Sequence, residues 1–172
     1  LKKRDLGKKK IDYKEAEKNA LEFVNKNKYE NMELNSRHSF NDFLIVSLVS
    51  QQNNVLIKTN SVIAEVALDN GEVVGFNGLD YLLHYKERPN EQLTPQLRQA
   101  EARDRISPRL KLTKEPELVL TVIDGEEKLC YEFIGIIKDG ERQNHYRVKI
   151  NAKTGDEEEI KVAKQDIYRK KD

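Results

Sequence analysis

The clearest alternation of hydrophobic and polar residues lies at positions 62–76 and predicts a β-hairpin. Apolar side chains recur at every second position up to Leu68 and resume at Val73, with Asp69-Asn70-Gly71-Glu72 between them. A two-residue type I′ turn needs positive φ at both central residues, and Asn-Gly is a pair that adopts it readily. We therefore predict a hairpin turn at Asn70-Gly71.

A similar alternation near the C-terminus predicts a second hairpin. Apolar residues alternate with basic ones at 146–150 and return at Ile160 and Val162, after a turn signal at Thr154-Gly155. Gly71 and Gly155 are separated by 84 positions (155 − 71), which is close to half of the 172 residues. This spacing predicts an internal duplication.

A helical pattern precedes each hairpin. Between 12 and 27, apolar residues fall at spacings of three and four, and Asp12 followed by Glu15 resembles a helix N-cap. The second helix is expected to start at Thr94-Pro95 and to stop before Pro108, with the less regular apolar face Leu97, Ala100, Ala102 and Ile106.

Strand-like runs lie between each helix and its hairpin. The run 43–49 is continuously apolar apart from one serine, which is typical of a strand buried on both faces. In the second half, strands are expected at 118–123 and 129–137, with turns at Asp124-Gly125 and Asp139-Gly140. The pattern of each half therefore predicts a helix followed by an antiparallel meander.

The predicted fold class is α+β, with two tandem units that each pack one helix on an antiparallel β-meander. The expected boundaries are a basic linker at 1–11, a first unit at 12–88, a second unit at 89–166 and a charged tail at 167–172. Units of this size bury a marginal core, so we expect them to pack together.

Composition narrows the class of partner. Charged residues make up 35% of the chain, but 31 basic residues against 30 acidic ones give a net charge of only +1. This balance offers no overall attraction to nucleic acid, which we exclude as a partner. No apolar run reaches the roughly 18 residues of a membrane span, so we expect the chain itself to be soluble.

The sequence contains no recognisable catalytic or metal-binding motif. The three histidines, His38, His84 and His145, are scattered, and the acidic run 156–159 lacks the ligand pattern of a calcium loop. The single cysteine, Cys130, lies in a strand-like run and is expected to be buried. We predict no metal, no cofactor and no catalytic residue. Paired carboxylates that meet only in space leave a cell-wall hydrolase open as an alternative.

The densest mixed cluster of side chains is Tyr81, His84, Tyr85 and Arg88, together with Lys86. Exposed aromatic and arginine side chains are enriched in binding hot spots, so this cluster is the candidate partner surface. The alternative is that it forms the packing seam between the two units.

Four stretches resemble the C-terminal region of the YpeB family of spore germination proteins, which is built from PepSY domains. The resemblance covers about 12–165. The stretches are VALDNGEVVGFNGLDYLLHYKER at 66–88, AEARDRISPRLKL at 100–112, KLCYEFIG at 128–135 and INAKTGDEEEI at 150–160. The segment 29–40 departs from the family pattern, because family members commonly have a more aromatic strand there.

The resemblance implies a non-catalytic protein of bacterial spores that acts with a cortex-lytic hydrolase of the SleB type. Such a protein would stabilise, localise or inhibit the hydrolase until germination. Family members are held at the outer face of the inner spore membrane or in the cortex by an N-terminal anchor that this sequence lacks. Direct binding of cortex peptidoglycan is the alternative function.

Two physical means of binding such a partner follow from the predicted fold. A strand of the partner could extend an exposed sheet edge, or the cluster around Tyr81, His84, Tyr85 and Arg88 could cover the partner's cleft. Charged hairpin ends discourage edge pairing, so the sequence favours the cluster.

Overall fold

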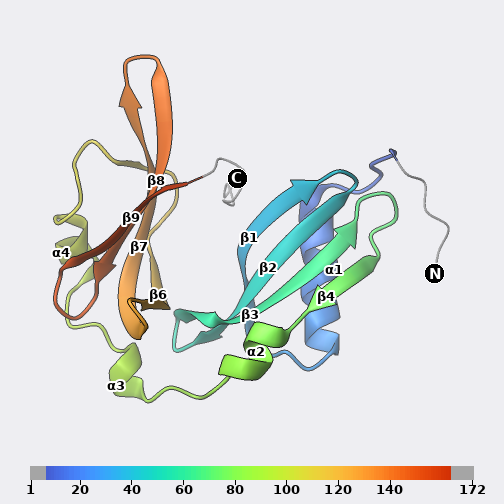
Figure 1. Cartoon of the computed structure of the whole chain (residues 1–172), viewed down its shortest axis with the longest axis horizontal. Helices are drawn as coiled ribbons and strands as arrows, with labels where there is room; N and C mark the ends of the chain where they lie inside the picture. The colour runs from blue at the N-terminus through green and yellow to red at the C-terminus, as the bar shows by residue number, and fades with distance from the viewer. Residues whose placement is uncertain (1–6, 164–172) are drawn as a thin grey trace. The chain divides into compact units, whose positions relative to one another are not determined.

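The computed structural model describes residues 7–163, which form two compact units (Figure 1). Of these residues, 7–51 and 59–86 belong to the first unit, and 52–58 and 87–163 belong to the second. Both units combine a sheet with few helices, which confirms the predicted α+β class. The predicted boundary at 88/89 stays a prediction. Residues 1–6 of the predicted linker and the whole tail 167–172 lie outside the described residues.

Helix α1 (Tyr13–Lys26) forms where the apolar spacing predicts it. Asp12 is the N-cap, and its carboxylate accepts the N–H of Glu15 at 2.8 Å. This bond satisfies one of the donors that a helix start leaves unpaired. The buried face of the helix consists of Ala16, Ala20 and Val24. Small residues at these positions let the helix axis approach the sheet closely.

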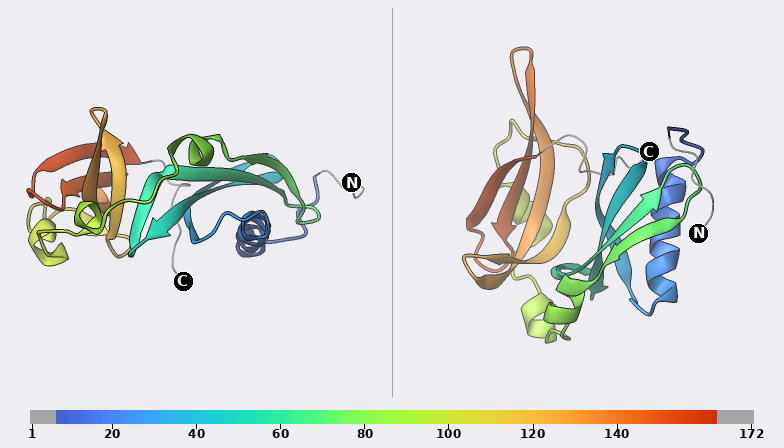
Figure 2. Two further views of the ribbon diagram at one scale, coloured as in Figure 1. Left: turned by 90° about the horizontal axis from the view of Figure 1, so that it is seen from below. Right: turned by 45° about the vertical axis from the view of Figure 1, so that its right-hand side comes forward.

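The sheet of the first unit has the order β1 (Met32–Phe40), β2 (Phe43–Gln52), β3 (Val55–Ala67) and β4 (Val73–Asn77). Helix α1 covers one face of these strands (Figure 2). The core between them contains Leu44, Val46, Leu48, Val62, Ala64, Val66 and Leu68.

Strand β2 corrects the prediction of a strand buried on both faces. Leu44, Val46 and Leu48 are buried, whereas Phe43 and Ile45 are only half-buried. The difference arises because α1 covers a single face of the sheet, so apolar side chains on the other face keep part of their exposure.

The predicted second helix is wrong in its start and length. The structure has α2 (Leu79–His84), α3 (Asn90–Leu93) and α4 (Gln99–Arg103), and Thr94 ends α3 rather than starting a helix. Its hydroxyl donates to the carbonyl of Asn90 at 2.7 Å. The backbone N–H groups of residues 96 and 97 donate to the carbonyl of Ala152 at 2.8 and 3.0 Å, and helix α4 begins only at Gln99.

The second unit contains a sheet whose order is the start of β3, then β6 (Glu117–Ile123), β7 (Glu126–Asp139), β8 (Arg142–Asn151) and β9 (Glu157–Ala163). A short strand, β5 (Lys111–Leu112), also pairs with β7. Its core contains Ile57, Leu93, Ala102, Ile106, Leu110, Leu120, Leu129, Tyr131, Phe133, Val148, Ile150 and Ala152.

One strand pair departs from the predicted antiparallel meander. Leu56 and Ile57 of β3 pair in parallel with Val119 and Leu120 of β6, while β6 to β9 pair antiparallel. A parallel pair requires a long connection, and residues 68–116 provide one. The second unit therefore takes a strand from an earlier part of the chain.

Both predicted hairpin turns are present at their glycines. Strands β3 and β4 are joined around Gly71, and β8 and β9 around Gly155, with φ values of 75° and 82°. The predicted type I′ geometry is wrong at Asn70, because Gly71 has positive φ and Asn70 does not. Each connection is a five-residue loop rather than a two-residue turn. In such a loop only the glycine needs positive φ, so the residue before it keeps an ordinary negative φ.

The two loops have the same hydrogen bonds at an offset of 84. Gly71 N–H donates to Ala67 C=O at 2.8 Å, and Gly155 N–H donates to Asn151 C=O at 2.9 Å. The carbonyl at the loop's first residue, Leu68 or Ala152, accepts two consecutive N–H groups from a preceding segment. The donors are residues 10 and 11 in the first unit and residues 96 and 97 in the second.

A buried carboxylate is held between two cations in the second unit. Glu132 of β7 lies 3.4 Å from Lys58 Nζ and 3.3 Å from Arg147 Nε. Burial alone would raise the pKa of Glu132, but these cations outweigh it and the pKa is lowered. Burial also lowers the pKa of Lys58 despite its carboxylate partner. The ionised group therefore stabilises the fold through its two partners.

We predict that Gly155→Ala destabilises the chain more than Gly125→Ala. Both glycines have φ near +80°, where an alanine costs about 1 kcal/mol. A Cβ at Gly155 would also lie 3.0 Å from Leu97 Cδ2, whereas nothing lies within 4 Å of one at Gly125. The added crowding should cost about 1 kcal/mol more, measured by urea denaturation. Equal losses of unfolding free energy would contradict this packing.

We predict that Glu132→Gln lowers stability by about 3 kcal/mol at neutral pH, because the half-buried cations Lys58 and Arg147 lose the buried carboxylate that pairs with both. The folded-state pKa of Glu132 lies below its usual value of 4.5, so its contribution is complete above that pH and is lost as the pH falls through the folded-state pKa. As the pH falls from about 5 to about 3, the variant should therefore lose less stability than the unmodified chain, because the unmodified chain loses this contribution below the ordinary glutamate pKa of about 4.3.

The control for this experiment is Glu126→Gln, which changes an exposed carboxylate of the same strand. Its effect should stay within about 0.5 kcal/mol. Thermal unfolding followed by circular dichroism across the pH series measures both variants. A Glu132 variant with the wild-type acid dependence would show that this carboxylate does not contribute.

Candidate functional site

Helix α2 exposes an apolar surface on the first unit. None of its residues is buried, and the exposed fractions are 57% for Leu79, 72% for Leu82 and 67% for Leu83. Tyr85, which follows the helix, is 59% exposed. We call these four residues the α2 surface. Contiguous exposed apolar groups on a soluble domain are typical of binding sites.

Polar contacts fix the position of α2. The N–H of Leu79 donates to Asn77 Oδ1 at 2.9 Å, and the hydroxyl of Ser61 on β3 donates to Asp80 Oδ2 at 3.0 Å. The helix is therefore attached to the end of β4 and to the neighbouring strand. A short helix gains little stability by itself, so these contacts hold it in place.

An aromatic ladder connects the α2 surface to the body of the first unit. The ring centroids are 5.5 Å apart for Phe23 and Phe76, 5.3 Å for Phe76 and Tyr29, and 4.9 Å for Tyr29 and Tyr81. Tyr81 then stacks on Tyr85 at 4.7 Å with an interplanar angle of 22°. Burial, with a smaller effect of Tyr85, raises the pKa of Tyr81 to about 12. One face of the exposed Tyr85 ring therefore packs against Tyr81, and the ladder fixes the position of that ring.

The four predicted site residues do not share one environment. Tyr81 is half-buried in the ladder, and Tyr85 and His84 are exposed. His84 Nδ1 lies 2.9 Å from the carbonyl of Asp80 within the same helix. These three residues belong to the first unit, whereas Arg88 belongs to the second. The prediction that Tyr81, His84 and Tyr85 contact a partner stays a prediction.

The prediction that Arg88 lies on an exposed surface is wrong. Arg88 is only 3% exposed, and its guanidinium donates to Glu127 Oε1 at 2.7 Å. Its backbone N–H donates to Gln52 Oε1 at 3.1 Å, and its carbonyl accepts from Gln52 Nε2 at 2.7 Å. Gln92 completes the group by donating to Glu127 Oε2 at 3.0 Å. Arg88 is therefore a structural residue of the second unit.

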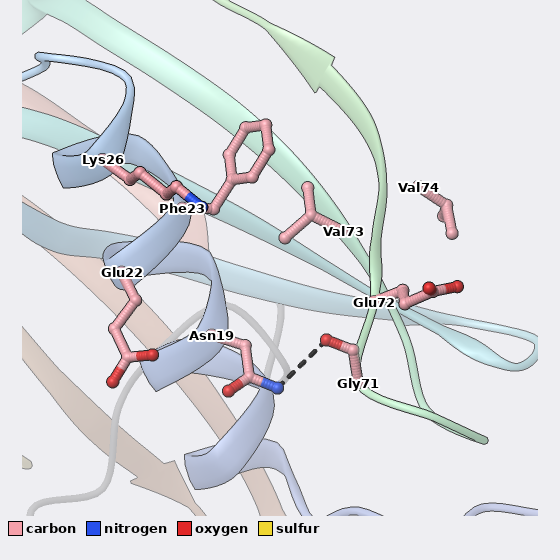
Figure 3. Close-up of a pocket in the computed structure, with 8 residues that line it drawn as sticks. All are labelled: Asn19, Glu22, Phe23, Lys26, Gly71, Glu72, Val73 and Val74. Atoms are coloured by element: carbon pink, nitrogen blue, oxygen red, sulfur yellow. Dashed lines mark hydrogen bonds between the residues drawn. The ribbon is translucent and has the colours of Figure 1, made fainter. Parts of the chain in front are cut away.

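A second feature of the first unit is an open groove of about 430 Å³ between α1 and the start of β4 (Figure 3). Asn19 donates to the carbonyl of Gly71 at 3.0 Å across one end of it. The groove is lined by Asn19, Glu22, Phe23, Lys26, Gly71, Glu72, Val73 and Val74. Figure 3 shows Val73 directed toward the helix and Val74 directed away from it.

The described part of the chain lacks an arrangement suited to metal chemistry. Within residues 7–163, no three His, Cys, Asp or Glu side chains lie where they could hold a metal ion. Cys130 is buried as predicted, and burial raises its pKa to about 11, which keeps the thiol protonated. Among the same residues, no helix is long and apolar enough to cross a membrane.

Sequence reasoning missed the three leucines of α2. They recur at spacings of three and four, which is the pattern of a buried helical face, so the sequence gives no sign that they are exposed. The groove could not be predicted from the sequence, because its two walls lie about 50 positions apart (71 − 19 = 52). The aromatic residues near α2 are the feature of the sequence that pointed to this part of the chain.

Comparisons with known proteins identify the family. The family model "YpeB sporulation, PepSY1 and PepSY2 domains" matches residues 1–91. The chain is similar to sporulation protein YpeB of Halalkalibacterium halodurans, at 34% identity over 93% of this chain, and to that of Bacillus subtilis, at 30% over 95%. It spans about a third of the length of these curated relatives, 34% and 36%.

A solved structure agrees with this assignment. The Bacillus megaterium YpeB C-terminal domain matches with a TM-score of 0.76 and 29% identity, over 96% of this chain and 71% of that chain. The sequence and the fold therefore point to the same family. Because the family model matches more than half of the 172 residues, the chain belongs to the YpeB sporulation protein family.

Proposed function

We propose that this chain is a non-catalytic interaction module of spore germination that stabilises, localises or inhibits a cortex-lytic hydrolase of the SleB type. Its family membership supports the role in spores. The observation that carries the interaction is the α2 surface, where three leucines and Tyr85 lie exposed on a supported helix. Tyrosine is enriched among the residues that supply most of the free energy of protein association, and the leucines add apolar area that a partner can bury.

We also propose that both units are PepSY-like. The family model that covers residues 1–91 describes PepSY domains. The five-residue loops at Gly71 and Gly155 have equivalent hydrogen bonds at an offset of 84, which supports a common origin for the two units. On this proposal the chain acts at the outer face of the inner spore membrane or in the cortex, through an anchor elsewhere in the parent protein.

Direct binding of cortex peptidoglycan is the second candidate function. It is favoured by the stacked pair Tyr81 and Tyr85, because an exposed aromatic ring presents a flat apolar face against which a sugar ring can pack. Tyr85 is flanked by His84 and Lys86, and these polar side chains contain N–H groups that can donate hydrogen bonds to the sugar.

We predict that the double variant Leu82→Ser and Leu83→Ser weakens binding of the purified chain to the hydrolase. Loss of two apolar anchors at a hot spot should cost about 2 kcal/mol, which raises the dissociation constant roughly thirty-fold. The dissociation constant is measured by titrating the purified chain over hydrolase immobilised on a surface.

The matched control replaces two exposed apolar residues of β9, as Ile160→Ser and Val162→Ser, with exposed fractions of 54% and 71%. It should leave the dissociation constant within about two-fold, a difference of about 0.4 kcal/mol. Circular dichroism must show that both variants are folded. An unchanged constant in the folded α2 variant would remove the α2 surface from the interface.

We predict that the chain releases no soluble muropeptides from purified cortex peptidoglycan. The physical reason is that the proposed role assigns no residue of the chain to cleavage of a glycosidic or amide bond. Chromatography of the supernatant after incubation measures release, and sedimentation with the intact glycan measures binding. Released muropeptides would establish the hydrolase alternative, and sedimentation that Tyr85→Ala abolishes would establish the wall-binding one.

A further inference from the structure

Tyr29, which follows the C-terminus of α1, connects that helix to α2. Its ring packs against Tyr81 of α2, with 4.9 Å between centroids and an interplanar angle of 76°. It also packs against Phe76 of β4, at 5.3 Å. Its hydroxyl lies over Gly78, the N-cap of α2, only 2.6 Å from the position that a Cβ would occupy there. Tyr29 therefore contacts α2 both at its start and at Tyr81.

The backbone at the end of α1 fixes the position of Tyr29. Asn27 is the C-cap of the helix. Beyond it, the N–H of Lys28 donates to the carbonyl of Asn25 at 3.0 Å, and the N–H of Tyr29 donates to the carbonyl of Val24 at 3.1 Å. These two bonds form a Schellman motif, which ends a helix and sets the direction of the chain that follows.

The left-handed residue of this motif is Lys28, with a φ of 67°. Glycine is the usual residue at this position, because a side chain is strained at positive φ. A lysine that keeps this conformation must be held in it by its surroundings, and such strained residues cluster at functional sites. The neighbouring contacts are those of Tyr29 in the aromatic ladder. The strained motif and the ladder therefore hold Tyr29 together.

Helix α2 depends on these contacts for its position. It is six residues long, and a helix of this length is not stable in isolation. Single hydrogen bonds from Ser61 and to Asn77 hold its first turn. Tyr81 is the one half-buried residue of the helix, and the other five are exposed. The packing of α2 on the first unit is therefore made by Tyr81, which in turn stacks on Tyr85.

We propose that Tyr29 is a positioning residue for the α2 surface. It acts through Tyr81, sets the orientation of α2 and of the Tyr85 ring, and contacts no partner itself. A surface that is already ordered in its bound geometry loses less conformational entropy on binding. This inference rests on the proposed function of the α2 surface, and it adds that the affinity of that surface is determined in part at the end of α1.

Hydrogen exchange of the full chain tests the positioning without any partner. The amides of Leu82 and Tyr85 donate to carbonyls of residues 78 and 81, at 3.0 and 2.8 Å, so their exchange reports the opening of α2. Tyr29→Leu removes two ring contacts and should speed this exchange about ten-fold. Tyr29→Phe keeps the ring and should stay within about two-fold of the unmodified chain. Unchanged exchange in Tyr29→Leu would overturn the proposal.

The matched control is Tyr13→Leu, which removes another tyrosine of the first unit. Tyr13 is 37% exposed and lies outside the ladder, with its ring centroid 5.4 Å from the guanidinium carbon of Arg37. This variant should leave the exchange of the α2 amides unchanged. Circular dichroism must show that both leucine variants are folded. Equal acceleration in the two variants would mean that the loss of Tyr29 only destabilises the unit as a whole, and the proposal would be overturned.

Binding to immobilised hydrolase tests the effect on affinity. Tyr29→Leu should raise the dissociation constant about ten-fold. In a Tyr81→Leu chain the same change should add less than about two-fold, because both residues act through one contact. Fully additive effects would show that Tyr29 acts by another route and would overturn the proposal. If the unmodified chain does not bind the hydrolase, the proposed function fails, and hydrogen exchange still decides the role of Tyr29.

Discussion

Each unit depends on one buried backbone carbonyl that accepts two hydrogen bonds. Leu68 and Ala152 are fully buried, and a buried acceptor must be paired with a donor within the protein. In both cases the donors are two consecutive N–H groups of the segment that leads into a helix. The carbonyl therefore fixes the hairpin loop and the path of the preceding segment at the same time.

This constraint explains why some elements could be predicted and others could not. The hairpins and α1 are specified by local patterns, namely alternation, a turn glycine and a capped amphipathic helix, so the sequence suffices for them. The start of α4 is set by a hydrogen bond to Ala152, more than 50 positions away, which no local propensity contains. The parallel pair of β3 with β6 escaped prediction for the same reason.

The candidate site shows the same division between local and distant information. Tyr81, His84 and Tyr85 could be found from their aromatic and polar character, and Tyr85 lies exposed. Arg88, only three residues later, has the same apparent character but is buried by its bond to Glu127, 39 positions away. Exposure depends on such partners, so composition cannot distinguish a binding arginine from a structural one.

The assignment of β3 to both units has a consequence for synthesis on the ribosome. Leu56 and Ile57 leave the exit tunnel 63 residues (119 − 56) before their partners Val119 and Leu120 leave it. At about 5 to 20 residues per second, these apolar residues wait several seconds beside a first unit that is already able to fold. The nascent chain therefore presents Leu56 and Ile57 without their β6 partners during that interval, although the rest of β3 can already pair with β4.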